Sequence, residues 1–165
     1  MRIYNPLFAL LLVGFLGTQC QRKAVPADPV AVPAVSDANA RISLRTTACF
    51  GRCPVYEFSI DGTGKATFNG KRFTDRLGRY ERTFSAAETK ALFAAFADAD
   101  FFGYEDAYTD DVTDLPNRYL GYTRGKQSKE IRLYAREPDA LRRLEQMVSR
   151  AALETQGWKA AAEKM

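Results

Sequence analysis

Cys49 and Cys53 are the two residues best placed for covalent or metal chemistry in this sequence of 165 residues. The chain contains no histidine, which excludes Ser-His-Asp and Cys-His catalysis and leaves acid–base chemistry to carboxylates, lysine, tyrosine or cysteine. A zinc ion would find only these two thiols nearby and would need carboxylates as its other ligands. Redox-active cysteine pairs usually have two intervening residues and lie at a helix N-terminus, whereas three residues separate Cys49 from Cys53 and no helix is expected there. A structural disulfide is the favoured interpretation, with a redox pair, a metal site and two free thiols as alternatives.

The backbone must reverse between the two cysteines if they are to form a disulfide. In a continuous strand their Cα atoms would lie about 13 Å apart, beyond the roughly 7 Å that a disulfide tolerates. A helix would bring them close enough, but Pro54 disfavours the helical conformation at Cys53, and the flanking residues alternate as strands do. We therefore predict a tight reversal at Phe50, Gly51 and Arg52, with Gly51 at positive φ.

A second candidate for chemistry is the acidic segment between residues 105 and 114. Its carboxylates belong to Glu105, Asp106, Asp110, Asp111 and Asp114. Clustered carboxylates can bind Ca²⁺ or act as an acid–base pair. Their spacing lacks the alternating oxygen ligands and the central glycine of an EF-hand loop, so a solvated acidic loop is favoured over a metal or catalytic site.

Basic residues gather between residues 65 and 82. They are Lys65, Lys71, Arg72, Arg76, Arg79 and Arg82, and the candidate basic face consists of Lys71, Arg72, Arg79 and Arg82. Such a sheet face could contact anionic lipid headgroups or a cell-wall polymer, although charged edge strands also prevent aggregation. The formal net charge of +4 is mild, and we predict no nucleic-acid partner and no cofactor.

The N-terminal segment has the features of an export signal. Arg2 precedes an apolar run over residues 7–16, which is shorter than the roughly 20 residues needed to span a bilayer as a helix. The run ends in Leu16-Gly17-Thr18-Gln19-Cys20. This ending resembles the lipobox of bacterial lipoproteins, although Gln19 stands where the lipobox has a small residue. The resemblance implies a signal peptide over residues 1–19 and a lipid on Cys20, with an ordinary secreted protein or an uncleaved anchor as alternatives.

The count of cysteines supports this interpretation, because lipidation of Cys20 would use the odd one of three and leave an even pair. The segment 20–40 contains Pro26, Pro29 and Pro33 among alanine, valine and aspartate. Such a segment favours extended conformers and forms no core. We predict a lipidated tether over residues 20–40 and a location in the cell envelope, outside the cytoplasm.

The remaining chain has the pattern of a single α+β domain over residues 41–158, followed by a tail at 159–165. Alternating residues predict strands at 41–45, 55–60 and 65–68, and further, more polar strands at 71–74 and 79–84 on either side of Gly78. Asp61-Gly62 and Asn69-Gly70 have the composition of tight turns. A further hairpin is predicted from residues 118–122 and 129–134 around Arg124-Gly125.

Two helices are expected between and after these strands. Ser85 and Glu88 have the spacing of a capping box, so a helix should begin there and bury Leu92, Phe93 and Phe96. A second helix should begin near Pro138 and end before Gly157. The predicted order is four strands, a helix, a two-strand hairpin and a helix, as an antiparallel sheet with the helices packed on one face.

The string Cys49-x-Gly51-x-Cys53-Pro54-x-Tyr56 is followed by Asp61-Gly62, an aromatic-rich helix and a late Trp158. In these features, residues 42–158 resemble an uncharacterised domain, a domain of unknown function, found in bacterial lipoproteins. The resemblance implies an envelope location and a small α+β domain, and it implies no activity.

We therefore expect a membrane-anchored lipoprotein of the cell envelope, with a disulfide-clipped binding or structural domain. Its expected partners are the membrane, through the lipid on Cys20, and an envelope protein or polymer. The alternative is a small envelope enzyme or metal-binding protein that uses the acidic loop 105–114.

Overall fold

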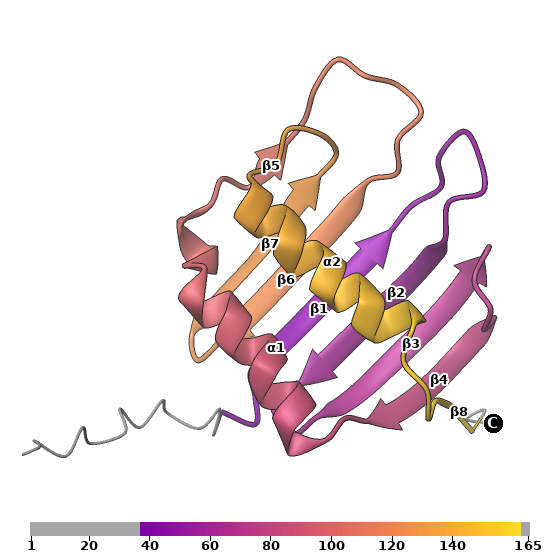
Figure 1. Ribbon diagram of the computed structural model, residues 1–165, viewed down its shortest axis with the longest axis vertical. Coiled ribbons are helices and arrows are strands. Elements are labelled where there is room, and N and C mark those ends of the chain that lie inside the picture. Colours follow the sequence, from indigo (N-terminus) through magenta and orange to yellow (C-terminus); the bar gives the residue numbers. More distant parts are fainter. Residues whose placement is uncertain (1–36, 163–165) are drawn as a thin grey trace, which may run out of the picture. The chain divides into compact units, whose positions relative to one another are not determined.

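A mostly antiparallel sheet of eight strands dominates the computed structural model, which describes residues 37–162 (Figure 1). Its strands are β1 (Arg41–Thr46), β2 (Val55–Asp61), β3 (Lys65–Arg72), β4 (Gly78–Thr83), β5 (Ala107–Tyr108), β6 (Arg118–Arg124), β7 (Gln127–Leu133) and β8 (Lys159–Ala160). Their order across the sheet is β5-β7-β6-β1-β2-β3-β4-β8. Only the short pair of β5 and β7 is parallel among the described strands.

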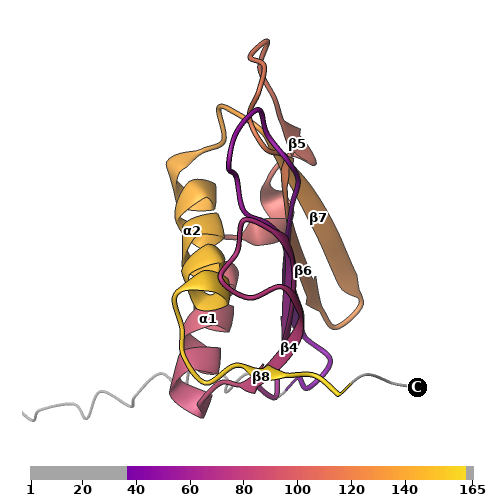
Figure 2. The same ribbon diagram turned by 90° about the vertical axis from the view of Figure 1, so that its right-hand side faces the viewer.

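Helices α1 (Ala86–Asp98) and α2 (Asp139–Leu153) lie on the same face of the sheet, and in residues 37–162 no element covers the other face (Figure 2). A short 3₁₀ turn at Phe101–Gly103 follows α1. None of the described helices is long and apolar enough to cross a membrane. The predicted signal segment, Cys20 and the tether up to residue 36 lie outside the described residues.

The predicted α+β class and the antiparallel sheet with helices on one face are confirmed, but the strand count differs. The two-residue strands β5 and β8, at opposite edges of the sheet, were not expected. The predicted turn at Asn69-Gly70 is wrong, because both residues lie inside β3. Gly70 is needed there for another reason: a Cβ at this position would collide with the Arg76 carbonyl of the β3–β4 turn, which folds over it.

The core lies between the helices and the sheet, and its residues alternate along the strands as the sequence predicts. Its largest fully buried side chains are those of Ile42, Leu44, Tyr56, Ile60, Phe68, Phe93, Phe96, Phe101, Leu120, Ile131, Leu133 and Leu141. The capping box of α1 is confirmed, since the Ser85 hydroxyl accepts from Glu88 N and the Glu88 carboxylate accepts from Ser85 N. The ring of Trp158 packs against Phe58 and Phe68 and joins the segment after α2 to the core.

The connection between β1 and β2 contains the predicted disulfide between Cys49 and Cys53, whose Cα atoms are 5.8 Å apart. The tight reversal with Gly51 at positive φ is wrong, because Gly51 is not among the residues with positive φ. The reversal is spread over residues 47–54, so no single position needs that conformation. A covalent loop of this length stabilises the fold by about 2 kcal/mol in the chain-entropy estimate.

The hydroxyl group of Thr46 forms hydrogen bonds with the backbone at the start of β2. The register of β2 and β3 shifts between Val55 and Tyr56, which disrupts the ladder locally as β-bulges do. Thr46 Oγ1 donates to the Pro54 carbonyl oxygen (2.7 Å) and accepts from Tyr56 N (3.1 Å). This side chain therefore satisfies backbone groups next to the irregularity.

A buried ionic cluster holds α2 to the sheet. Arg118 on β6 contacts Glu137 (Nη2–Oε1, 3.0 Å) and Glu145 (Nη1–Oε2, 3.5 Å), and Arg142 Nε lies 3.6 Å from Glu137 Oε1. The Glu137 side chain is only 5% exposed. Burial acts to raise the pKa of Glu137, but a backbone hydrogen bond and the two guanidinium groups hold that pKa below its ordinary value. Burial, with Glu137 nearby, raises the pKa of Glu145.

The two carboxylates should therefore respond differently to neutral, isosteric replacement. At neutral pH, Glu137→Gln should destabilise the domain by about 3 kcal/mol, because it leaves Arg118 without its closest anion. Glu145→Gln should cost less than about 1 kcal/mol, because burial already disfavours its charge. Denaturant unfolding measures both free energies, and equal losses in the two variants would contradict this assignment.

The pH dependence has opposite signs at the two sites. The stabilisation by Glu137 is fully present above its unfolded pKa of about 4.3 and is lost as the pH falls through the lower folded pKa. The difference between wild type and Glu137→Gln should therefore shrink in acid. Relative to Glu145→Gln, the wild type should lose stability as the pH rises above about 4.3.

Candidate functional site

The acidic segment does not form a metal site in the part of the chain that the structure describes. No group of three or more histidine, cysteine, aspartate or glutamate side chains in residues 37–162 could hold a metal ion. Asp110 forms an ion pair with Arg136 (2.5 Å), and Asp106 forms one with Lys129 (3.1 Å). Asp111 and Asp114 are exposed. The segment therefore has the properties of a solvated loop.

The predicted basic face is divided between the two sides of the sheet. Lys71 and Arg79 project from the uncovered side, where Lys71 Nζ lies 2.5 Å from Glu57 Oε1. Arg82 points toward the helices, with its guanidinium over the Phe84 ring and an ion pair to α1. Arg72 lies near the Phe73 ring in the β3–β4 turn. The four residues therefore do not act as one surface.

The uncovered side of the sheet contains a groove that runs across the strands. Ser43 of β1 is paired with Gly121 of β6 and with Ser59 of β2, and Ser59 is paired with Thr67 of β3. Four neighbouring central strands thus place small residues in one row. We call this row the groove floor.

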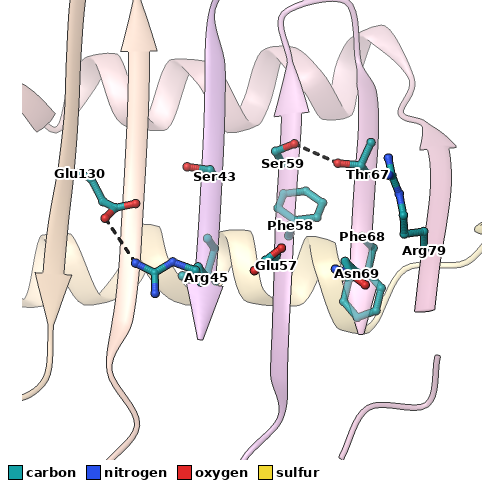
Figure 3. Close-up of a pocket in the computed structure, with 11 residues that line it drawn as sticks. Ser43, Arg45, Glu57, Phe58, Ser59, Thr67, Phe68, Asn69, Arg79 and Glu130 are labelled. Atoms are coloured by element: carbon teal, nitrogen blue, oxygen red, sulfur yellow. Dashed lines mark hydrogen bonds and ion pairs between the residues drawn. The ribbon is translucent and has the colours of Figure 1, made fainter. Parts of the chain in front are cut away.

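One hydrogen bond joins two side chains of the floor, Ser59 and Thr67 (Figure 3), and a second comes from Arg41 beside it. Ser59 Oγ and Thr67 Oγ1 are 3.0 Å apart, and Arg41 Nη1 donates to Ser59 Oγ at 3.0 Å. A Cβ at Gly121 would lie too close to the Ser43 hydroxyl, so a larger residue there would force the Ser43 side chain to move. The floor therefore presents an ordered line of hydroxyl groups to solvent.

A row of side chains that includes charged residues borders the floor on each side. One wall is the adjacent row of paired residues, Tyr119, Arg45, Glu57, Asn69 and Arg79. The other wall consists of Arg41, Asp61, Lys65 and Thr83. The hollow between them has a volume of about 460 Å³ at the first wall and continues into one of about 840 Å³, with Ser59 and Thr67 shared by both.

Two charged residues of the first wall, Arg45 and Glu57, form exposed ion pairs. The Arg45 guanidinium lies 3.7 Å from the centre of the Tyr119 ring and 3.6 Å from Glu130 of β7, as Figure 3 shows for the ion pair. A hydrogen bond from Lys71 lowers the pKa of Glu57, which therefore stays ionised at neutral pH. Hydroxyls and charges of this kind can bind a polar ligand through hydrogen bonds and ion pairs.

Comparisons with known proteins identify a family for the chain but assign no activity to this site. Residues 40–152 match the model of a family described as a domain of unknown function (DUF6438). The matched part extends from the start of β1 to the end of α2, so it includes the disulfide and the groove floor. No protein with a curated description matches the chain.

The geometry of the acidic loop predicts that calcium will not stabilise the domain. Titration with millimolar Ca²⁺ should leave the melting temperature unchanged, because no group of three or more carboxylates in the described residues could hold the ion. Calcium bound at a hundred times its Kd would instead stabilise the domain by about 2.7 kcal/mol. Thermal unfolding with and without EDTA measures this. An upward shift in melting temperature that disappears in the triple variant Asp110→Asn, Asp111→Asn, Asp114→Asn would show a calcium site.

Proposed function

The chain belongs to the DUF6438 family, domains of unknown function, and on this premise we propose that it is a lipid-anchored binding protein of the cell envelope. In this proposal the signal segment directs export and Cys20 carries the lipid. The tether then separates the domain from the membrane, and the uncovered sheet face binds an envelope polymer.

Three features support export and anchoring. The apolar run ends at the lipobox-like sequence before Cys20, and several acyl chains on one cysteine would bind a membrane stably, at about 0.8 kcal/mol per buried CH₂. The disulfide between Cys49 and Cys53 is typical of an oxidising compartment. Use of these two thiols leaves Cys20 as the remaining cysteine of the chain.

The groove floor is the observation that carries the binding function. An antiparallel sheet often leaves one face to water, and that face is then commonly covered by long polar side chains. Here the middle row is reduced to glycine, serine and threonine on four adjacent strands, between two rows that carry charged side chains. A recessed row of small polar residues is suited to an elongated polar ligand, and the wall residues supply charge for its recognition.

Anchoring is tested by removal of the lipid acceptor. Cys20→Ala should move the protein from the membrane fraction to the soluble fraction of fractionated cells, because no acyl chain can then be attached. The double variant Cys49→Ala, Cys53→Ala is the matched control and should stay with the membrane. Continued membrane association of Cys20→Ala would contradict lipid anchoring.

Binding by the groove is tested by filling it. Thr67 is exposed at the β3 end of the floor, where it lines both hollows, and a β-strand tolerates tryptophan there. Thr67→Trp should reduce co-sedimentation of the full chain with purified cell-wall fragments about tenfold or more, because the indole ring occupies the floor. Ala87→Trp, on the exposed surface of α1, is the control and should bind like the wild type. Equal retention of Thr67→Trp and wild type would refute binding in the groove.

A further inference from the structure

The free charges beside the groove floor indicate the chemistry of its ligand. Glu57 is paired with Lys71, and Glu130 is paired with Arg45. The remaining charged side chains that line the two hollows, other than Arg82 on its ion pair to α1, are Arg41, Lys65, Arg79, Lys159, Asp61 and Glu81. Basic groups are in excess in this set, so the groove favours an anionic ligand.

One of the two acidic groups in this set is already used by the fold. The Asp61 carboxylate accepts hydrogen bonds from the backbone N–H groups of Thr63 (2.9 Å) and Lys65 (3.1 Å) in the β2–β3 turn. Arg79, by contrast, is exposed and has no ion pair among the described residues. Arg79 is therefore the free cation that lies at the first wall, next to the hydroxyls.

The direction of the groove favours a polysaccharide over an extended peptide as its ligand. Peptides that add to a sheet bond to the free backbone groups of an edge strand, but the floor lies on central strands whose backbone groups are used in the ladders. The ligand can therefore meet only side chains. The floor crosses four strands, about 15 Å, and its hydroxyls can each donate and accept. These properties match the hydroxyl groups repeated along a sugar chain.

Arg45 can also exchange Glu130, its ion-pair partner, for a group of the ligand. Arg45 and Glu130 have side chains that are 42% and 53% exposed, and an ion pair this exposed contributes about 0–1 kcal/mol. A ligand carboxylate could replace Glu130 beside Arg45 at little cost. Arg45 would keep its contact with the Tyr119 ring, 3.7 Å from the ring centre.

From these observations we propose that the groove binds a linear anionic polysaccharide, a chain of carboxylate-bearing sugars. Its carboxylates would contact Arg79 and Arg45, and its hydroxyl groups would bond to Ser59 and Thr67. This inference rests on the proposed binding function and names the ligand class for the same groove.

Binding of oligogalacturonides, linear chains of uronic acids, by the full chain in detergent tests the inference. Isothermal titration should show binding that weakens as salt is added and that exceeds binding of neutral cello-oligosaccharides of equal length. Arg79→Gln should weaken binding about tenfold or more, because it removes a charge-assisted hydrogen bond. Arg143→Gln, on the exposed surface of α2, should bind like the wild type.

Other outcomes would overturn the inference in distinguishable ways. Neutral chains bound as tightly as oligogalacturonides, with both blocked by Thr67→Trp, would leave a groove that binds sugars but refute the anionic ligand. Stronger binding of polyglutamate or of phosphatidylglycerol vesicles would indicate an acidic peptide or a lipid surface instead. Failure to bind any of these probes, together with failure to bind cell-wall fragments, would refute the proposed function as well. If Arg79→Gln does not fold, the wild type alone decides the question: its binding of oligogalacturonides should weaken as salt is added, and its binding of neutral chains should not.

Discussion

The pairing of β1 with β6 is the constraint on which the rest of the structure depends. It joins the β1–β4 meander to the β6–β7 hairpin, and these strands are separated by α1 and the acidic loop along the chain. Ile42 and Leu44 of β1 are fully buried on the helix side. A shift of one residue in this register would turn them to solvent. It would also separate Ser43 from Gly121 and break the groove floor.

Contacts at both ends of β1 hold this register. At one end Thr47 N donates to the Asn117 carbonyl (3.0 Å) and Asn117 N donates to Thr47 Oγ1 (3.0 Å). At the other end the Asp37 carboxylate accepts from Gly125 N in the β6–β7 turn (2.9 Å).

The cysteine motif is also tied to the core, through its last residue, Tyr56. The Tyr56 side chain is buried, and its hydroxyl lies 3.0 Å from the Ser149 hydroxyl of α2. Burial raises the pKa of Tyr56 to about 12. The motif therefore has an architectural role.

Local signals in the sequence were sufficient for both helices and most of the longer strands, but not for the short edge strands or for the site. The spacing of Ser85 and Glu88 predicted the start of α1, and alternation predicted most strands, because hydrogen bonds and burial within a few residues decide these features. Alternation also places Ser43 and Ser59 on a polar face. The alignment of Ser43 with Gly121 depends on a long-range pairing that no local pattern reports. Asn69-Gly70 has the composition of a turn, yet Gly70 lies inside β3, where the Arg76 carbonyl of the following turn leaves no room for a side chain.

Burial decides which charges of this domain belong to the fold and which are available to a ligand. Arg118 and Glu137 meet just before α2 begins, and the Glu137 side chain is only 5% exposed, so separating the pair would cost about 3–5 kcal/mol. Arg45 and Glu130 have the same chemistry on the uncovered face, but water screens them and little is lost when they part. The sheet thus separates two kinds of ion pair by its two faces. The helix-covered face uses charge to fix α2, and the open face keeps its charges exchangeable beside a floor of hydroxyls.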